Sequence, residues 1–164
     1  MVQYVFKETQ KITQIWIWAL LLLVNSILVW GLFFANPPKP TEGWENVVPL
    51  SMLLLVNGLL LSLTLNTRIS STSLSFSFFP FIKERKYSFG EIESMELIEY
   101  NSILKYGGWG IRYNGDSWAY NTGGKFGILV TTESKKFLLG THKPEEAQKA
   151  IAHFKEKKSQ NHGR

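Results

Sequence analysis

The chain has 164 residues, 45% of them hydrophobic, and it carries 18 Lys and Arg against 13 Asp and Glu. It contains no cysteine, which excludes disulfide scaffolds, thiolate zinc sites, iron–sulfur clusters and cysteine nucleophiles. Residues 1–66 carry three positive and three negative side chains, so all of the net charge of +5 lies in residues 67–164. We therefore expect two unlike regions, one dominated by apolar residues and one of mixed composition.

Two long uncharged runs predict membrane-spanning helices in the first region. They cover residues 15–35 and residues 47–65. A helix rises about 1.5 Å per residue, so the first run reaches roughly 30 Å, the thickness of the hydrocarbon core of a bilayer. This run is longer than the apolar part of a secretory signal peptide, and no clear cleavage site follows it. Residues 1–66 are thus predicted to form a transmembrane hairpin.

The charges around the two runs predict the orientation of this hairpin. The intervening segment, residues 36–46, is rich in proline, which favours a turn, and it carries Lys39 beside Glu42 and Glu45. Basic residues are more numerous before the first run and after the second, at Lys7, Lys11, Arg68, Lys83, Arg85 and Lys86. By the positive-inside rule, both termini are predicted to be cytoplasmic and the protein to be multi-pass.

A short repeat places one amide side chain in each span. The sequence LLLVNS at residues 21–26 is matched by LLLVNG at residues 53–58. In an antiparallel hairpin, Asn25 and Asn57 would lie at nearly equal depth, and an amide in lipid needs a partner. We expect a hydrogen bond between them worth about 0.6–2 kcal/mol, either within one hairpin or between two copies of the chain. A transport site is disfavoured because the spans contain no ionisable group.

The second region changes to the alternating pattern of β-strands. Leu74, Phe76 and Phe78 would share one face of a strand at residues 73–78. Further short strands are predicted at residues 86–89, 94–100, 111–113, 118–121, 126–132 and 136–140. A helix is then predicted from Pro144, with one apolar face formed by Ala147, Ala150, Ile151 and Phe154. The expected fold class is α+β: a small antiparallel β-barrel or sandwich, covered by a C-terminal helix.

Seven short strands followed by one amphipathic helix resemble a bacterial pleckstrin-homology-like (PH-like) domain. The segments that carry this resemblance are residues 78–92, 106–113, 118–124 and 140–146. The resemblance implies a cytoplasmic PH-like domain at residues 67–158, a flexible tail at residues 159–164, and a place in the bacterial inner (cytoplasmic) membrane. It also implies binding or assembly rather than catalysis. The loop between the first two strands would be residues 70–73, with Arg68 as the one nearby base, so phosphoinositide recognition is disfavoured.

A glycine-rich stretch offers a candidate site for a protein partner. Residues 106–112 read YGGWGIR, where glycines permit positive φ or close backbone approach. The spacing matches no phosphate-binding loop, so a structural turn is the alternative interpretation. Trp109, Arg112 and Trp118 are the candidate partner-binding residues. Arg112 is expected to pair with Asp116, to stack on one of the tryptophans, or to contact an acidic partner.

A basic cluster soon after the second span is a candidate contact for anionic lipid. Lys83, Arg85 and Lys86 could each contribute about 1 kcal/mol close to a negatively charged leaflet. The alternative interpretation is that these charges only aid solubility and topology. Binding of nucleic acid is not expected, because the positive charge is dispersed and lacks interleaved stacking residues.

No residue pattern in the sequence predicts catalysis. His142, His153 and His162 lack metal-ligand spacing, and the glutamates at positions 91–99 alternate as a solvated face would. We therefore expect no enzyme activity, cofactor or metal. The predicted function is that of a membrane-anchored binding or scaffold protein whose cytoplasmic domain recruits a protein segment or lipid head group. The alternative is a small accessory subunit of a membrane transporter or membrane enzyme complex. The expected partners are membrane lipid and a protein, which could include a second copy of the chain.

Overall fold

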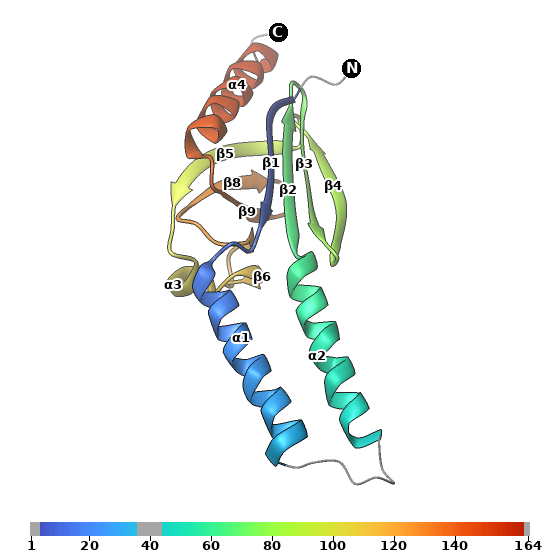
Figure 1. Cartoon of the computed structure of the whole chain (residues 1–164). Coiled ribbons are helices and arrows are strands. Elements are labelled where there is room, and N and C mark those ends of the chain that lie inside the picture. The colour runs from blue at the N-terminus through green and yellow to red at the C-terminus, as the bar shows by residue number, and fades with distance from the viewer. Residues whose placement is uncertain (1–3, 36–43, 163–164) are drawn as a thin grey trace. The chain divides into compact units, whose positions relative to one another are not determined.

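The computed structural model describes residues 4–35 and 44–162 of the chain (Figure 1). These residues belong to two compact units, which we call the helical unit, residues 13–62, and the sheet unit, formed by the residues up to Ile12 and from Leu63 onward. The helical unit contains α1 (Ile15–Trp30), a π-helical turn (Gly31–Ala35) and α2 (Trp44–Ser62). The strands of the sheet unit are β1 (Tyr4–Lys11), β2 (Thr64–Ser70), β3 (Ser73–Phe79), β4 (Ile82–Ser88), β5 (Ile92–Glu99), β6 (Gly110–Tyr113), β7 (Trp118–Asn121), β8 (Phe126–Thr132) and β9 (Lys136–Thr141). Its helices are α3 (Ser102–Tyr106) and α4 (Pro144–His162).

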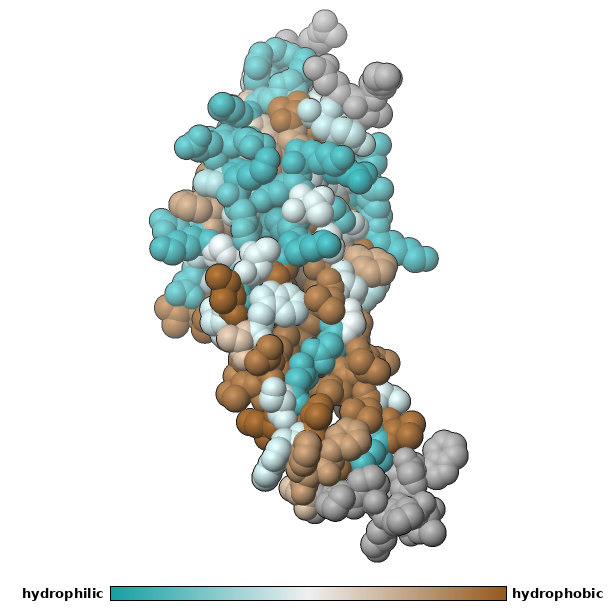
Figure 2. All heavy atoms as spheres, viewed as in Figure 1, coloured by the Kyte–Doolittle hydropathy of each residue, from teal (hydrophilic) through white to brown (hydrophobic). Residues whose placement is uncertain are grey.

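The helical unit consists of two apolar helices whose side chains mostly face outward. No residue of α1 is buried, and apolar residues predominate on the face of this unit drawn in Figure 2, with a few polar residues among them. The second predicted run is wrong at its end, because α2 stops at Ser62 and the following residues enter β2. Most of the predicted turn between the runs, residues 36–43, lies outside the described residues.

The largest correction to the predicted organisation concerns the N-terminal residues. Residues 1–66 were predicted to form the hairpin alone, but Tyr4–Lys11 is a strand that pairs with β2 along Thr64–Ser70. The inward-facing side chains of β1 are Phe6, Glu8 and Gln10, all buried. Because two of these three are polar, hydrophobic alternation could not reveal the strand. The helical unit is thus an insertion between two paired strands.

The strands form two sheets. The first has the order β1-β2-β3-β4 and is antiparallel throughout, and the second has the order β5-β8-β9-β7-β6, with β7 parallel to β9. Among the described residues the two sheets do not close into one barrel. The predicted strands at residues 111–113, 118–121 and 126–132 are confirmed. The strand predicted to start at residue 86 starts earlier, at Ile82.

One apolar core lies between the sheets and is covered by α4. Phe76 contributes from the first sheet, and its ring centroid lies 4.8 Å from that of Tyr120 and 5.3 Å from that of Phe137 in the second sheet. The predicted apolar face of α4 is confirmed, since Ala147, Ala150, Ile151 and Phe154 are all buried. This helix continues to His162, so the flexible tail predicted from residue 159 is wrong as far as that residue.

Candidate functional site

The β6–β7 hairpin forms one edge of the second sheet and presents exposed aromatic and cationic side chains. Tyr113 and Trp118 face each other across the two strands, with ring centroids 5.1 Å apart, and both are exposed. Their neighbours Arg112 and Ala119 also pair across the strands. Because successive side chains of a strand point to opposite faces, Arg112 lies on the face opposite to Trp118.

The glycine-rich stretch shapes the chain as it enters β6. Asn101 caps the short helix α3, where its Oδ1 accepts hydrogen bonds from the backbone N–H groups of Ile103 and Leu104 at 3.0 and 3.1 Å. The helix ends at Gly107, whose φ is +70°, and Gly108 follows at +135°. Residues other than glycine rarely adopt these φ values. The two glycines therefore supply the turn into β6, and partner binding at this stretch stays a prediction.

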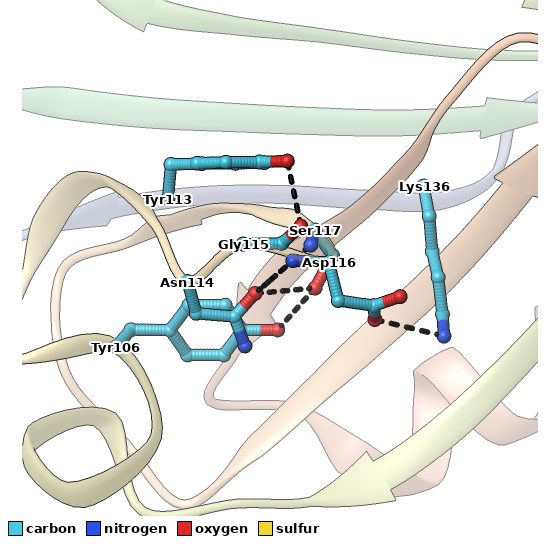
Figure 3. Close-up of polar contacts among 7 residues, drawn as sticks. All are labelled: Tyr106, Tyr113, Asn114, Gly115, Asp116, Ser117 and Lys136. Atoms are coloured by element: carbon cyan, nitrogen blue, oxygen red, sulfur yellow. Dashed lines mark hydrogen bonds and ion pairs between the residues drawn. The ribbon is translucent and has the colours of Figure 1, made fainter.

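Side-chain hydrogen bonds order the turn between β6 and β7 (Figure 3). The Oδ1 of Asn114 accepts from the backbone N–H groups of Asp116 at 3.1 Å and Ser117 at 2.9 Å. The Ser117 hydroxyl also lies 2.9 Å from the hydroxyl of Tyr106, which is buried beneath the turn. The Tyr113 hydroxyl donates to the Gly115 carbonyl at 2.8 Å. This turn is preorganised, so a partner that docks on it pays little ordering entropy.

Arg112 does not make the ion pair that the sequence suggested. Its Nε donates to the Trp109 carbonyl at 3.1 Å, whereas Asp116 lies 3.0 Å from the Nζ of Lys136 in β9. Of the three candidate residues, Trp109 and Arg112 are brought together, and Trp118 lies on the other face with Tyr113. Sequence reasoning missed Tyr113, because its role depends on the cross-strand register.

Each sheet has two edge strands in the described part of the chain, β1 and β4 in the first and β5 and β6 in the second. Of these, β4 and β6 differ in how they are protected. In the described part of the chain, β4 pairs only with β3, and β6 pairs only with β7. β4 carries four consecutive exposed charges, Lys83 to Lys86, and such charges discourage the addition of another strand. β6 carries one charge, Arg112, among Gly110, Ile111 and Tyr113. The edge of β6 is therefore the more permissive of the two.

The predicted basic cluster is divided between two faces of β4. Arg85 pairs in register with Phe76, and its charge partly offsets the effect of burial, which raises the pKa of the Tyr120 hydroxyl. Lys86 faces the other side, where it lines a polar groove of about 360 Å³ together with Arg68 and Glu84. Arg68 and Glu84 form an ion pair at 3.8 Å in that groove. Arg85 and Lys86 thus lie on different faces of β4, and contact of the cluster with anionic lipid stays a prediction.

In the helical unit, the hydrogen bond predicted between Asn25 and Asn57 is present. Each amide donates to the other, with N···O distances of 3.1 and 3.2 Å. Asn57 Nδ2 also donates to the carbonyl of Leu53 at 2.8 Å. The pair borders a groove of about 720 Å³ that is lined mainly by apolar and aromatic side chains, including Trp18 and Trp30. That this pair lies within a membrane stays a prediction.

One helix in the described part of the chain, Ile15–Ala35, is long and apolar enough to cross a membrane. The apolar part of the second helix, Asn46–Ser62, is shorter. Length and composition alone do not separate a membrane span from a signal sequence near the N-terminus. The pairing of β1 with β2, the strands on either side of the helical unit, supplies an independent criterion for choosing between a membrane span and a signal sequence.

The described residues contain no group of three or more His, Asp or Glu side chains arranged to hold a metal ion. No protein-family model matches the chain, and no curated protein and no solved structure is significantly similar to it. The functional interpretation therefore depends on the geometry of the two units.

Proposed function

We propose that this protein is a non-enzymatic, membrane-anchored binding or scaffold protein that captures an extended protein segment at the edge of β6. The observation that carries the proposal is the insertion of an apolar helical unit between two paired strands of one folded sheet unit. The helical unit supplies the anchor, and the sheet unit supplies the binding surface.

The pairing of β1 with β2 supports two membrane crossings rather than one. The residues before α1 and after α2 pair in one sheet, with Lys11 opposite Thr64. A single crossing would place these two strands on opposite sides of the bilayer and break their hydrogen bonds. An even number of crossings keeps them together, so α2 crosses back although its apolar stretch is short, as a thinned bilayer or snorkelling flanks permit.

The same pairing supports a retained first helix rather than a cleaved signal. Cleavage after α1 would remove β1, and with it the buried side chains of Phe6, Glu8 and Gln10. The carboxylate of Glu8 accepts hydrogen bonds from the Thr141 hydroxyl at 2.7 Å and from the His142 N–H at 2.9 Å. These groups would lose their partners, at a cost that argues against removal of the segment.

The edge of β6 supports the choice of an extended protein segment as the partner. Strand addition gives affinity through main-chain hydrogen bonds, and neighbouring side chains give specificity. Tyr113 and Trp118 offer an aromatic face beside this edge, and Arg112 offers a cation on the opposite face. A lipid head group is less suited to this edge, because β6 carries a single charge, Arg112.

The arrangement of the sheet unit is consistent with the PH-like proposal. A four-stranded antiparallel sheet is followed by a second sheet and then by a C-terminal helix. On this proposal the helical unit occupies the connection between the first two strands. The excess of basic residues outside the helical unit supports a cytoplasmic location for both termini, and the bacterial inner membrane is what the PH-like resemblance implies.

One observation favours the second function, that of an accessory subunit of a membrane transporter or membrane enzyme complex. The groove beside Asn25 and Asn57 is open and about 720 Å³ in volume. Its lining by Trp18, Leu22 and Trp30 would accept a helix from another membrane protein through close apolar packing. In that case the partner would depend on the helical unit rather than on β6.

Site-specific photo-crosslinking in native membranes tests the proposed function. A photoreactive phenylalanine analogue is placed at Tyr113 in the full chain, and its matched control is placed at Glu84, an equally exposed position in another edge strand, β4. We expect position 113 to crosslink to one discrete segment of a protein, and position 84 to give no such product. The substitution Arg112→Glu should weaken the crosslink at position 113, whereas Lys86→Glu, an equal change of charge on β4, should leave it intact.

The outcome separates the two candidate functions. Crosslinks that form only from a position in the groove, such as Leu22, would favour the accessory subunit and overturn the role of β6. Equal products from positions 113 and 84 would indicate nonspecific contact and also contradict the proposal. Thermal melting of each variant checks that the sheet unit remains folded.

A further inference from the structure

One end of the first sheet carries both connections to the helical unit. Lys11, Thr64 and Phe79 are cross-strand partners in β1, β2 and β3. The chain passes from Lys11 to the start of α1 at Ile15, and α2 ends at Ser62, just before β2 begins. The turn between β3 and β4 therefore lies at the same end of the sheet as these two connections (Figure 1).

This turn exposes large apolar side chains that the sheet unit does not cover. Phe79 is 57% exposed and Phe81 is 62% exposed. The turn at the opposite end of the sheet, between β2 and β3, consists of small hydroxyl residues at positions 70–73. The two turns of one sheet thus differ sharply in polarity, and the apolar turn is the one beside the connections.

Helix α3 adds a second pair of exposed apolar residues at this end. Ile103 is 59% exposed and Leu104 is 85% exposed. Gln10, next to the end of β1, donates a hydrogen bond from Nε2 to the Gly140 carbonyl at 2.6 Å. Gly140 in turn lies near the hydroxyl of Tyr100, which would be 3.3 Å from a Cβ added at that glycine. Tyr100 leads directly into the cap of α3, so this helix lies beside the end of β1 (Figure 1).

We propose that Phe79, Phe81, Ile103 and Leu104, here called the apolar rim, insert into the surface of the bilayer that holds the helical unit. This inference depends on the proposed membrane anchor. It makes the sheet unit a part of the membrane-binding structure and not a domain suspended on a tether.

The length of the connections supports this contact. Ser62 and Thr64 are two residues apart, so their Cα atoms are separated by at most about 7 Å. Neighbouring strands lie about 5 Å apart, which brings the backbone of Phe79 within roughly 12 Å of the end of α2. The polar interface of a bilayer is about 5–8 Å thick on each side of the hydrocarbon core. From this distance a phenylalanine ring that is directed toward the bilayer reaches the interface.

The charges beside the apolar rim suit a lipid surface better than an apolar protein surface. Lys11, Lys83 and Lys105 are exposed and adjoin the end of β1, the turn and α3. Lysine side chains can extend their ammonium groups toward lipid phosphates while their methylene stems remain against apolar groups. Such cations also favour the negatively charged cytoplasmic leaflet.

Single-cysteine fluorescence in lipid vesicles tests this contact. The chain has no cysteine of its own, so Phe81→Cys and Leu104→Cys can each carry one environment-sensitive dye. The full chain is reconstituted in vesicles of phosphatidylcholine and phosphatidylglycerol in equal parts. Ser71→Cys, in the polar turn, is the matched control within the sheet unit. Leu23→Cys, in α1, reports insertion of the helical unit.

We expect the dyes at positions 81 and 104 to emit at shorter wavelength than the dye at position 71. They should be quenched by nitroxide-bearing lipid and protected from aqueous iodide. Lipid quenching at position 23 with iodide quenching at positions 81 and 104 would overturn the apolar rim and leave the anchor intact. Iodide quenching at position 23 would instead reject the anchor itself. Emission at shorter wavelength without lipid quenching would show that protein, such as a second copy, covers the rim.

Discussion

The two units of this protein treat the same residue types in opposite ways. In the helical unit Leu22 is 70% exposed, whereas in the sheet unit Leu74 is fully buried, at 0%. The sheet unit satisfies its apolar side chains with its own core. The helical unit leaves them outward and joins its two helices through one pair of amides. Such a surface needs apolar surroundings to be stable, and on the proposed membrane anchor lipid supplies them where the sheet unit has a protein core.

The largest effect should follow removal of a ring from the core of the sheet unit. Phe76 is buried among Tyr87, Tyr120 and Phe137, so Phe76→Ala leaves a cavity and should lower the free energy of unfolding by about 3–5 kcal/mol. Leu22→Ala in α1, which is exposed, should leave the stability of the sheet unit unchanged. Near-UV circular dichroism of both variants, melted in one detergent, measures the difference. Equal melting temperatures would contradict the contrast between the two units.

The second prediction concerns β1, which adjoins the helical unit in sequence but belongs to the sheet unit. Glu8 is buried and accepts hydrogen bonds from Thr141 Oγ1 and the His142 N–H. Glu8→Ala leaves both donors without a partner, so we expect a loss of about 1–3 kcal/mol in the free energy of unfolding. Lys7→Ala, at the exposed neighbouring position, is the control. Chemical denaturation of the sheet unit provides the measurement, and equal midpoints would show that β1 is dispensable.

This strand also shows where prediction from sequence ends. The predictions succeeded where apolar and polar residues alternate, as in β3, where turn residues bound a short apolar run, as in β8, and where the period is helical, as in α4. β1 was not predicted, because the polar residues Glu8 and Gln10 occupy its buried positions and their hydrogen-bond partners lie more than 100 residues away in sequence. The start of β2 was predicted as the end of the second span, because Leu65 is as apolar as the residues of α2 that precede it.

The residue types of the candidate site were predictable from the sequence, but which of its side chains share a face of the hairpin was not. Glycines with positive φ and exposed aromatic residues were expected around positions 107–118. The face that each side chain occupies depends on the register of β6 with β7, which pairs Trp118 with Tyr113 and places Arg112 opposite. The partner of Asp116, Lys136, lies in a strand that is distant in sequence. The Asn25–Asn57 contact was found from sequence because both residues occupy the same place in a repeat.

A smaller effect is expected from the amide pair of the helical unit. Asn25→Leu removes the reciprocal hydrogen bonds with Asn57, and polar contacts between membrane helices are worth about 0.6 kcal/mol on average. We expect a loss of about that size in the association of α1 with α2, measured as reversible separation of the helices in lipid bicelles. Ser26→Ala is the control, because Ser26 bonds to a carbonyl within its own helix. A loss as large as that of Phe76→Ala would show that the amide pair, and not the lipid, holds this unit together.

The smallest expected effect lies at the turn between β4 and β5, and it depends on pH. Glu91 accepts hydrogen bonds from the backbone N–H of Ser88 at 2.6 Å and from its hydroxyl at 2.8 Å. These bonds favour the charged form and lower the pKa of Glu91 below its usual value of 4.5. A lowered pKa in the folded state contributes stability above the unfolded value, and this stability is lost as the pH falls through the folded value.

Glu91→Gln should therefore lower the melting temperature slightly at neutral pH, and the difference from the unsubstituted protein should shrink as the pH falls below 4.5. The equivalent change at the exposed Glu96 is the control. The side chain of Glu91 is on the surface, so solvent screening keeps the effect small. A difference that grows in acid would show that the turn is ordered by the protonated carboxyl. A difference in melting temperature that shrinks in acid, as expected here, would show that the charged Glu91 orders this turn. Even a surface turn of the sheet unit would then be fixed by the unit's own polar contacts, without help from a membrane.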